Sequence, residues 1–479
     1  MFTQEYNEYV RANSTAIKEK RGWGRYVHAV NFYRTKALIV PQSSVLAIGP
    51  WVSDLLPGLN PSRAVGIDPF ANLCETSLSS HIQVYPDATE LDNVTGTFDY
   101  VILPFSFGFM EDIHESLLKI RRFCHPRTRL IVTYYRKFWQ PLIKLAEVLG
   151  IKAKSSEMNW VPPQEIENLM TLADFQVIKD ISFCLLPIRI PFLSNFVNKY
   201  FGNLPLFDAL GVLSMVVGRP SQVASTEAKT PPRVSVLVPA RNEAGNIPVI
   251  VERIPRFPGG CEIIFVEGNS TDDTPGAIAK VIKDNPDLEI MSLTQPGRGK
   301  KDAVLKGFAA ATGDILLILD ADMTVPPESL PRFVGILEQG KAEFVNGTRL
   351  VYPMRGRAMR FINLLGNHFF SSCFSYLLDQ RVRDTLCGTK VMYREDFYRM
   401  HESFRYFGNM DPFGDFDFLF AATRLNLKIV DLPVRYTERV YGETNINRWR
   451  DGSILLRMVV FGAFKLKFHW LPLTRWAAK

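Results

Sequence analysis

The sequence predicts an α/β protein with two units, each built around a mostly parallel sheet. Between residues 44 and 104, short apolar strands alternate with helical stretches, a pattern typical of a doubly wound sheet. Residues 313–327 contain an apolar run that ends in two acids one residue apart, as expected of a strand covered on both faces. Residues 219–233 separate these regions and have the Pro, Ser and charge content of a solvated linker. Each part of the 479-residue chain is therefore large enough for its own core.

The first unit is predicted to span residues 1–218. Its strand at 44–49 is followed by a strand that ends at Asp68, by a segment that begins at Asp87, and by the strand at 98–104. Ligands of open α/β sheets bind outside the carboxyl ends of the strands, so acids at these positions are candidate binding residues.

This pattern resembles the class I S-adenosylmethionine-dependent methyltransferases over about residues 40–218. Residues 159–178 fit the late helix and strand of that family. The resemblance implies a Rossmann-like sheet with S-adenosylmethionine as the cofactor. It also implies that Gly49 approaches the methionine end of the cofactor, that Asp68 binds the ribose hydroxyls, and that Asp87 lies near the adenine.

The loop after the first strand departs from that family. Where the family has an acid and three alternating glycines, this chain has Ala47, Gly49, Trp51 and Ser53. The indole of Trp51 should obstruct the close backbone approach that glycine permits. Two interpretations of the first unit therefore stay open, an active methyltransferase and a degenerate binding or scaffolding domain. The sequence identifies no catalytic base for methyl transfer.

The second unit has its candidate site at the end of the apolar run, where Asp320 and Asp322 are expected to share one divalent cation. Oxygen ligands of this kind suit Mg²⁺ or Mn²⁺, which bind few protein carboxylates and complete their shell with water and substrate phosphates. An Asp-Ala-Asp by itself is more often a strand-end turn or a helix cap than a metal site. The assignment therefore depends on the neighbouring segments.

Three further segments follow the order that a nucleotide-sugar enzyme needs. The strand at 234–238 is stopped by Pro239 and followed by polar residues. The strand at 262–266 ends in Glu267, with a Gly/Asn turn and a capped helix behind it. A flexible basic turn at 297–301 then precedes another helix. These segments are predicted to form one crevice along adjacent parallel strand ends.

Residues 234–445 resemble the inverting family-2 glycosyltransferases, and within them the branch that contains dolichyl-phosphate mannose synthase. The resemblance rests on six ordered motifs, at residues 238–243, 266–274, 319–322, 346–349, 384–390 and 439–445. It implies a GT-A fold for residues 234–450, and the transfer of a sugar from a nucleotide-diphosphate donor with inversion at the anomeric carbon.

The same resemblance assigns roles to individual residues. Those expected to bind the nucleotide sugar are Pro239, Arg241, Glu243, Glu267, Asp320, Ala321 and Asp322. Among them, Glu267 would contact the base or ribose, and the last three would hold the metal and the diphosphate. Arg349 and Arg439 would bind phosphate oxygens of the donor or the acceptor.

The chemistry explains why such residues are needed. Breaking a sugar–diphosphate bond builds negative charge on the leaving group, which a metal and fixed guanidinium groups stabilise. An alcohol acceptor also needs a carboxylate base, and Asp415 and Asp417 lie where family members that use alcohol acceptors carry it. A lipid phosphate is already ionised near pH 7 and needs no base. The alternative role for both acids is the N-cap of the following helix.

Four positions depart from the phosphate-acceptor branch. Arg241 replaces an aromatic residue, Gly268 replaces the second acid of an Asp-Asp pair, Thr324 replaces a Gln and Asn445 replaces a Lys. The donor and acceptor therefore stay open, and GDP-mannose cannot be separated from UDP-glucose on these residues.

Composition narrows the partners. The net charge of +7 and the pI of ≈ 9.0 favour anionic lipids or acidic substrates, because the sequence contains no nucleic-acid-binding module. The six cysteines have no paired spacing, and the first residues do not form a signal peptide, so we expect a cytoplasmic location.

Two segments are candidates for contact with a membrane surface. Residues 361–378 lack formal charge but carry too many polar side chains for a spanning helix. Residues 451–479 are predicted to form a basic amphipathic helix and tail. Its face would carry Arg450, Arg457 and Lys465, and Trp470 and Trp476 would lie near the membrane boundary. The alternative is a helix packed on the protein itself or on a dimer partner.

The sequence thus predicts a metal-dependent glycosyltransferase on the cytoplasmic face of a membrane, with a lipid-linked or glycan acceptor. Its first unit would methylate the sugar or the acceptor in polysaccharide or glycolipid assembly. The alternative is a polyprenyl-phosphate glycosyl synthase whose methyltransferase-like unit is a degenerate scaffold. The oligomeric state is not predicted.

Overall fold

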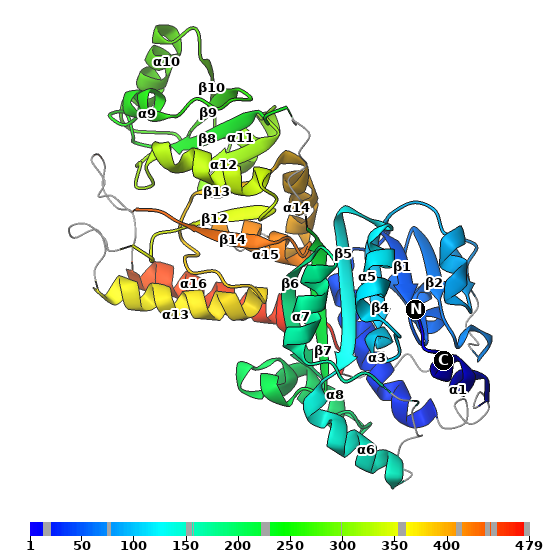
Figure 1. Ribbon diagram of the computed structural model, residues 1–479. Helices are drawn as coiled ribbons and strands as arrows, with labels where there is room; N and C mark the ends of the chain where they lie inside the picture. The colour runs from blue at the N-terminus through cyan, green and yellow to red at the C-terminus, as the bar shows by residue number, and fades with distance from the viewer. Residues whose placement is uncertain are drawn as a thin grey trace. The chain divides into compact units, whose positions relative to one another are not determined.

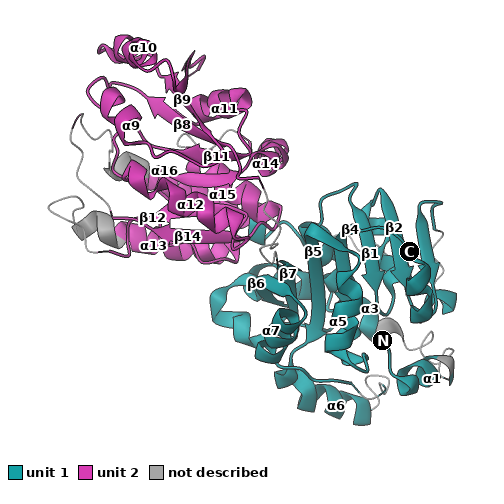
Figure 2. Ribbon diagram, turned by 45° about the horizontal axis from the view of Figure 1, so that its top comes forward, with its two compact units in different colours: residues 1–221, 466–479 teal, residues 222–465 magenta. Residues whose placement is uncertain are grey.

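The chain forms two compact units in a computed structural model (Figure 2). Unit 1 contains residues 1–221 and 466–479, and unit 2 contains residues 222–465. The structure describes residues 1–12, 21–73, 78–149, 156, 158–221, 230–297, 299–352, 361–408, 414–435, 441 and 448–473.

Unit 1 contains a seven-stranded sheet in the order β3-β2-β1-β4-β5-β7-β6 (Figure 1). Its strands are β1 (Ser44–Ile48), β2 (Arg63–Ile67), β3 (Ile82–Tyr85), β4 (Phe98–Pro104), β5 (Cys124–Tyr135), β6 (Phe175–Phe183) and β7 (Leu213–Pro220). The first five strands are mutually parallel, whereas β7 runs antiparallel to both β5 and β6. The predicted α/β fold of this unit is confirmed, and its sheet is mixed.

Helices cover both faces of this sheet. They are α1 (Gln4–Ala12), α3 (Arg21–Leu38), α4 (Val52–Leu55), α5 (Ile113–Arg121), α6 (Gln140–Val148), α7 (Pro163–Leu172) and α8 (Leu193–Tyr200), with short 3₁₀ turns between them. Along β1, Leu46 and Ile48 enter one apolar cluster, and Val45 and Ala47 enter the other. A strand buried on both faces needs a continuous apolar run, which is why β1 does not alternate with polar residues.

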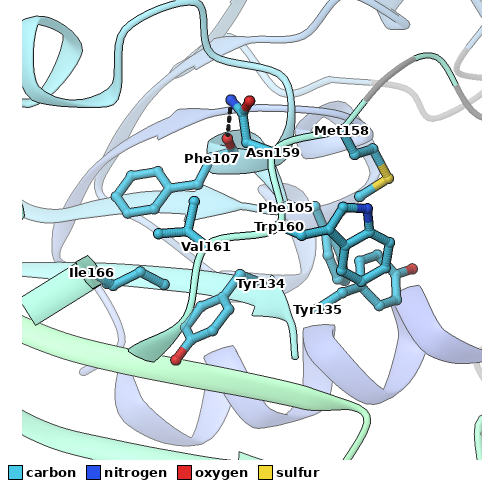
Figure 3. Close-up of a pocket in the computed structure, with 10 residues that line it drawn as sticks. Phe105, Phe107, Tyr134, Tyr135, Met158, Asn159, Trp160, Val161 and Ile166 are labelled. Atoms are coloured by element: carbon cyan, nitrogen blue, oxygen red, sulfur yellow. Dashed lines mark hydrogen bonds between the residues drawn. The ribbon is translucent and has the colours of Figure 1, made fainter. Parts of the chain in front are cut away.

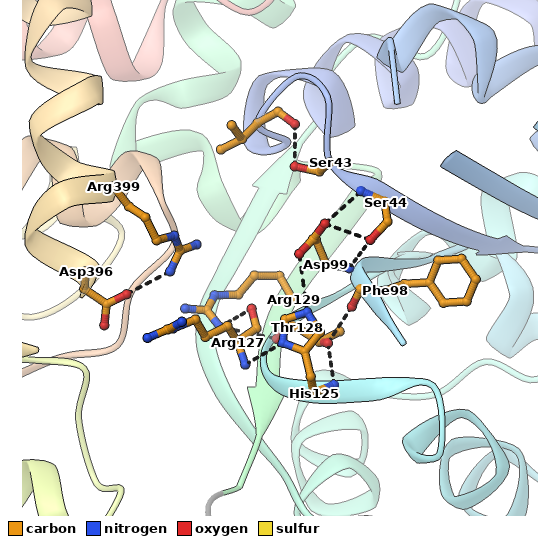
Figure 4. Close-up of polar contacts among 11 residues, drawn as sticks. Ser43, Ser44, Phe98, Asp99, His125, Arg127, Thr128, Arg129, Asp396 and Arg399 are labelled. Carbon is orange, nitrogen blue, oxygen red and sulfur yellow. Dashed lines mark hydrogen bonds and ion pairs between the residues drawn. The ribbon is translucent and has the colours of Figure 1, made fainter. Parts of the chain in front are cut away.

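A polar cluster fixes the amino-terminal ends of β1 and β4 in unit 1 (Figure 4). The Asp99 carboxylate accepts hydrogen bonds from the backbone N–H of Ser44 at 2.8 Å and from its hydroxyl at 2.7 Å. His125 approaches the same carboxylate at 3.3 Å. The hydrogen bond from His125, together with those from Ser44, lowers the pKa of Asp99 despite partial burial. This cluster lies at the sheet edge opposite to the one where ligands of such sheets bind.

Unit 2 contains a second seven-stranded sheet, in the order β10-β9-β8-β11-β13-β12-β14. Its strands are β8 (Val234–Ala240), β9 (Cys261–Glu267), β10 (Glu289–Thr294), β11 (Ile315–Ile318), β12 (Phe344–Thr348), β13 (Lys390–Tyr393) and β14 (Ile429–Pro433). The strands from β8 to β11 are parallel, and β13 runs antiparallel to β11 and β12. The second predicted α/β sheet is therefore present, and it is mixed.

The helices of unit 2 are α9 (Ile247–Arg253), α10 (Thr274–Asp284), α11 (Lys300–Ala310), α12 (Leu330–Glu338), α13 (Phe361–Leu378), α14 (Arg394–Phe407), α15 (Asp415–Arg424) and α16 (Arg448–Gly462). Helix α13 packs against α16 (Figure 1). Among the helices that the structure describes, none combines the length and apolarity that crossing a bilayer requires.

Two predicted boundaries are wrong. The linker does not begin at residue 219, because Arg219 and Pro220 continue β7 and pair with Gln176 and Phe175 of β6. Unit 2 does not end at residue 450, because α16 and the π-helical turn Ala463–Lys467 extend it to residue 465.

The last described residues return to unit 1. Trp470 is 4% exposed, its ring packs edge-on against Phe183 at 6.2 Å, and the Arg34 guanidinium lies 5.1 Å from its centre. The prediction that Trp470 lies at a membrane boundary is therefore wrong, because this indole belongs to the core of unit 1. Trp476 lies outside the described residues, as does the side chain of Arg450.

Replacing the buried indole should destabilise unit 1. We expect Trp470→Ala to lower its free energy of unfolding by about 3–5 kcal/mol, because the substitution leaves a cavity. Urea unfolding followed by circular dichroism would measure the change. Leu473→Ala, at a nearby exposed residue, is the matched control and should have little effect. Equal stability of the two variants would contradict the packing of the chain end on unit 1.

Candidate functional site

The candidate site of unit 2 lies where β8, β9 and β11 end. Ala240 at the end of β8 pairs with Glu267 at the end of β9, and Ile318 of β11 pairs with Leu237 of β8. Asp320 lies two residues after the end of β11, so parallel pairing brings these segments to one edge of the sheet. The predicted common edge is thus present in the structure.

Asp320 is held by a lysine that the sequence analysis placed in a basic turn without a role. Lys300 is the first residue of α11, and its Nζ lies 2.6 Å from Asp320 Oδ1. Burial alone would raise the pKa of Asp320, but the positive charges of Lys300, Lys390 and Arg349 outweigh this effect and lower it. The carboxylate therefore stays ionised and attracts cations.

Gly388 allows this pair to form. A Cβ atom on Gly388 would lie 2.0 Å from Asp320 Oδ2 and 2.2 Å from Lys300 Nζ, so any larger residue would displace the two charged groups. The sequence analysis included Gly388 in a motif but could not identify this close contact, because it joins residues far apart in the chain.

Asp322 has a different environment. Its Oδ1 accepts hydrogen bonds from the backbone N–H of Thr324 at 3.1 Å and from the Thr324 hydroxyl at 2.9 Å. Among the described residues, no group of three or more His, Cys, Asp or Glu side chains could hold a metal ion. Two carboxylates still fit Mg²⁺ or Mn²⁺, which take one or two protein carboxylates together with substrate phosphates. Asp320 and Asp322 would hold such an ion, and this stays a prediction.

Asp415 and Asp417 do not cap α15. Gly414 is the N-cap residue, and the two acids lie in the first helical turn and are buried. Asp415 Oδ1 lies 3.1 Å from Lys390 Nζ, and Asp417 forms an ion pair with Lys301. Burial raises the pKa of Asp417, and Lys301 offsets this only in part. The N-cap alternative is therefore wrong for both acids.

Lys300 connects the two groups of acids electrostatically. Burial by itself would lower the pKa of Lys300, but the charges of Asp320, Asp415 and Asp322 raise it above its ordinary value. The candidate base Asp415 and the candidate metal ligands thus act on one ammonium group.

Lys390 is a further buried cation that the sequence analysis did not assign. It is fully buried, and its Nζ donates hydrogen bonds to the Cys387 carbonyl at 2.7 Å and to Asn346 Oδ1 at 3.3 Å, beside Asp415. These partners fix the ammonium group next to the Asp415 carboxylate.

Arg349 forms a bidentate pair with Asp384. Arg349 Nε lies 2.6 Å and Nη2 lies 2.9 Å from the Asp384 carboxylate, which also accepts the Arg349 backbone N–H at 3.1 Å. Burial would raise the pKa of Asp384, but Arg349 lowers it. This structural contact was not predicted, and the phosphate-binding role of Arg349 stays a prediction. Arg439 lies outside the described residues.

The remaining predicted nucleotide-binding residues lie along the same edge. Glu267 Oε1 accepts the Ser270 backbone N–H at 2.6 Å, and Glu243 Oε2 accepts a hydrogen bond from Asn246 at 2.6 Å. Pro239 is half-buried, Arg241 is exposed and Ala321 is buried. A Cβ atom on Gly268 would lie 3.2 Å from Cβ of Arg241, so the two departures from the family pattern are neighbours.

The predicted cofactor site of unit 1 is built differently. Asp68 is fully buried, and its two oxygens accept hydrogen bonds from the backbone N–H groups of Trp51, Ser53 and Phe70 at 3.0, 3.0 and 2.9 Å. The Ser53 hydroxyl adds another at 2.6 Å. Burial raises the pKa of Asp68, and these hydrogen bonds offset the effect only in part. Asp68 thus holds the altered loop through these hydrogen bonds, and its predicted contact with ribose hydroxyls stays a prediction.

Aromatic side chains fill the carboxyl-end edge of this sheet. Trp51 stacks on Phe70 with ring centres 4.7 Å apart. Tyr6 of α1 stacks on Phe109 at 4.1 Å and meets Phe70 edge-on at 6.2 Å. Helix α1 thus packs against the loops after β2 and β4, where a cofactor would have to enter.

Gly49 and Asp87 have structural roles here. Gly49 has φ +149°, and a Cβ atom on it would lie 2.3 Å from Ser106 Oγ, so glycine is required for contact with the end of β4. Asp87 is exposed and caps a 3₁₀ turn by accepting the Thr89 backbone N–H at 3.0 Å. Neither contact requires a bound cofactor.

A narrow hollow lies beyond β4 and β5 in unit 1 (Figure 3). Phe105, Tyr135 and Trp160 line it, together with Phe107 and Met158. Aromatic side chains form much of the lining of this hollow.

Residues 235–400 match the family model described as glycosyl transferase family 2. The chain is 29% identical over 149 residues to an undecaprenyl-phosphate 4-deoxy-4-formamido-L-arabinose transferase from Yersinia enterocolitica, covering 29% of this chain and 45% of the relative. The enzyme of the same name from Serratia proteamaculans is 30% identical over 139 residues, covering 28% of this chain and 43% of the relative. The chain thus spans less than half the length of these curated relatives.

Solved structures give weaker similarities. The crystal structure of M. tuberculosis glucosyl-3-phosphoglycerate synthase has a TM-score of 0.35 and 20% identity, covering 49% of this chain and 81% of that one. A Pyrobaculum calidifontis mannosyltransferase in complex with GDP-Man and Mn²⁺ has a TM-score of 0.35 and 22% identity, covering 52% and 67%. Scores this low support no inference about this chain.

The C-terminal region therefore contains a domain of glycosyltransferase family 2, which is a family of enzymes. This part of the sequence prediction is confirmed. The methyltransferase assignment of unit 1 is not shown by any of these comparisons.

The Arg349–Asp384 pair should contribute strongly to stability. We expect Arg349→Met to lower the free energy of unfolding of unit 2 by about 3–5 kcal/mol, because it leaves a buried carboxylate without its cation. Arg253→Met removes the exposed pair with Glu328 and is the matched control, with an expected loss of about 1 kcal/mol or less. Urea unfolding of both variants tests the difference, and equal losses would contradict it.

Proposed function

We propose that the family-2 domain of unit 2 transfers a sugar from a UDP- or GDP-linked donor to a phosphate-bearing lipid or a glycan, with inversion and with Mg²⁺ or Mn²⁺. The observation that carries this proposal is that Asp320 and Asp322 follow β11 beside Lys300. Lys300 forms an ion pair with Asp320 and also interacts electrostatically with Asp415. This arrangement supplies cation-binding carboxylates, a fixed ammonium group and a candidate base at one sheet edge.

The leaving diphosphate needs positive charge. A bound metal would neutralise its oxygens when held by Asp320 and Asp322. Lys300 adds a positive charge that is already fixed before the reaction, and such preorganised charge stabilises the transition state without reorganisation. Lys300, beside Asp320, would be placed to bind the phosphate oxygens of the leaving group.

The acceptor decides whether Asp415 acts as a base. An alcohol acceptor needs Asp415 to take its proton, whereas a phosphate acceptor attacks in its ionised form. The curated relatives are named as undecaprenyl-phosphate transferases, and this supports the second candidate, a polyprenyl-phosphate glycosyl synthase. In that case Asp415 would orient Lys390 and would not act as a base.

Unit 1 would act as a scaffold and would not methylate. Three observations support this part of the proposal: the hydrogen bonds that saturate Asp68, the Trp51–Phe70 stack, and the packing of α1 at the same edge. Each of them places the protein's own atoms where a cofactor would bind.

We also propose that the protein lies on the cytoplasmic face of a membrane. In unit 2, Leu456, Val460 and Phe464 are exposed apolar residues of α16 and the turn after it, and Arg457 is exposed beside them. An apolar helix face flanked by basic residues is typical of interfacial binding. This supports the predicted basic amphipathic character of the segment 451–479 only in its first part, up to residue 465.

The metal assignment predicts the activity of two variants. We expect Asp320→Asn to lower Mn²⁺-dependent sugar transfer by about 100-fold or more, because one charge-stabilising ligand is lost. Radiolabelled transfer from UDP- and GDP-sugars to undecaprenyl phosphate would measure it. Asp314→Asn, at the opposite end of β11, is the matched control and should retain activity.

Asp415→Asn in the same assay identifies the acceptor class. Retained activity of this variant supports a phosphate acceptor. A loss of activity with a hydroxyl-bearing acceptor supports the assignment of Asp415 as the catalytic base. Asp320→Asn with more than half the wild-type rate would refute the metal site. Wild-type protein that transfers no sugar from any donor would overturn the proposal.

The scaffold assignment predicts no binding of S-adenosylmethionine. Calorimetric titration of the full chain with about 1 mM S-adenosylmethionine should give no heat of binding. The reason is that the Asp68 carboxylate already accepts hydrogen bonds from the loop that contains Trp51. A micromolar dissociation constant would overturn this part of the proposal and restore the methyltransferase.

A further inference from the structure

We infer that unit 1 has its own surface for binding an anionic lipid bilayer, formed by α6 and by the segment at residues 189–210. This inference concerns unit 1 alone and does not depend on the proposed sugar transfer. It is also separate from α16, where the sequence predicted membrane contact.

Helix α6 is exposed along its whole length. None of its residues is buried, although it carries several large apolar side chains. Leu142, Leu145 and Leu149 follow the spacing of one helix face, and each is more than half exposed. Phe138 precedes the helix and is 66% exposed, and Val148 is 79% exposed. A helix that packed on its own unit would bury such residues.

Helix α8 has its polarity reversed. Its buried residues are Ser194, Asn195 and Asn198, whereas Leu193 and Phe196 are exposed. A helix on the surface of a protein in water normally shows the opposite arrangement. Such a helix is favourable where its outer face meets hydrocarbon.

The buried polar side chains of α8 all have partners. Asn195 Oδ1 accepts the Tyr26 hydroxyl at 3.1 Å, and Asn198 hydrogen-bonds both the N–H and the carbonyl of Leu186 at 2.9 Å. The Ser194 hydroxyl donates to the Ile188 carbonyl at 2.6 Å. These bonds fix the orientation of α8, so its apolar face is a stable feature of the fold.

The exposed apolar surface continues beyond α8. Phe192 just before the helix is 73% exposed, and Leu206 after it is 82% exposed. Hydrogen bonds join this segment to the start of α6, from Trp139 Nε1 to the Leu210 carbonyl at 3.2 Å and from Arg136 Nη1 to the Asp208 carbonyl at 2.6 Å. Both helices lie at the same end of unit 1 (Figure 1). They therefore form one continuous surface.

The charges on this surface favour an anionic bilayer over a protein partner. Lys137, Lys144 and Arg189 are exposed beside the apolar side chains, and Lys199 is half-buried over the Tyr200 ring. Acids are fewer, with Glu147 half-buried and Asp208 exposed. Basic side chains around exposed Leu and Phe residues are the pattern that binds the headgroup region of anionic membranes.

Vesicle co-sedimentation of the full chain tests this surface. The probe is a set of vesicles of phosphatidylcholine alone and of phosphatidylcholine with phosphatidylglycerol at about 7:3. The test variant carries Leu142→Gln, Leu145→Gln, Phe196→Gln and Leu206→Gln. The matched control replaces four exposed apolar residues elsewhere by Gln, at Leu118, Leu172, Leu288 and Met291.

We expect wild-type protein and the control to bind the anionic vesicles, and the test variant to bind at least about tenfold more weakly. Circular dichroism should show the same fold for all three. Equal binding of the test variant and wild type would overturn the inference, as would wild-type protein that binds neither kind of vesicle.

Sedimentation velocity without vesicles distinguishes a second copy of the chain as the partner. Wild-type self-association that the four substitutions abolish, together with absent vesicle binding, would assign the surface to a dimer and overturn the inference. Nucleotide release from the sugar donor is measured on the same samples. Its failure would count against the proposed function and would leave the vesicle result unaffected.

Discussion

Three carboxylates at the candidate site of unit 2, those of Asp320, Asp415 and Asp417, are each paired with a lysine, and this pairing determines how the site is built. Removing an ionised carboxylate from water costs several kcal/mol unless a positive charge compensates it. Lys300 and Lys301 are consecutive residues at the start of α11, and they pair with Asp320 after β11 and with Asp417 in α15. Lys390 on β13 pairs with Asp415 in the same helix. A change in any one pair leaves a charge uncompensated, so the strand end, α11 and α15 depend on each other.

The two units use the same sheet edge in opposite ways. In unit 2, Asp320 after β11 forms an ion pair with the Lys300 side chain. In unit 1, Asp68 accepts hydrogen bonds from backbone N–H groups of the adjacent loop. An acid at the end of a parallel strand is therefore not sufficient evidence of a ligand site, because the chain itself can supply the hydrogen-bond donors.

Both units also expose apolar helix faces flanked by basic residues. In unit 1 the polar side of α8 faces inward and forms hydrogen bonds with Tyr26 and Leu186, so Phe196 is exposed on the opposite side. In unit 2, Leu456 and Val460 are exposed on α16 beside Arg457. A lipid-linked acceptor would lie at a membrane, and surfaces of this kind on both units are consistent with an enzyme that meets its acceptor there.

The sequence by itself determined the two α/β units, the strands around residues 44–104 and 313–319, and the position of Asp320 at a strand end. These features depend on local hydrophobic patterns and turn residues, which are read along the chain. Only the tertiary structure decided that Lys300 binds Asp320 and that Arg349 binds Asp384. It also decided that Trp470 packs in the core of unit 1 and that Asp68 is buried and hydrogen-bonded to the adjacent loop. The physical reason is that each of these contacts joins different segments of the fold, which are brought together only by folding. Packing and charge compensation in three dimensions determine which residues become partners, and the local pattern of the sequence does not show these contacts.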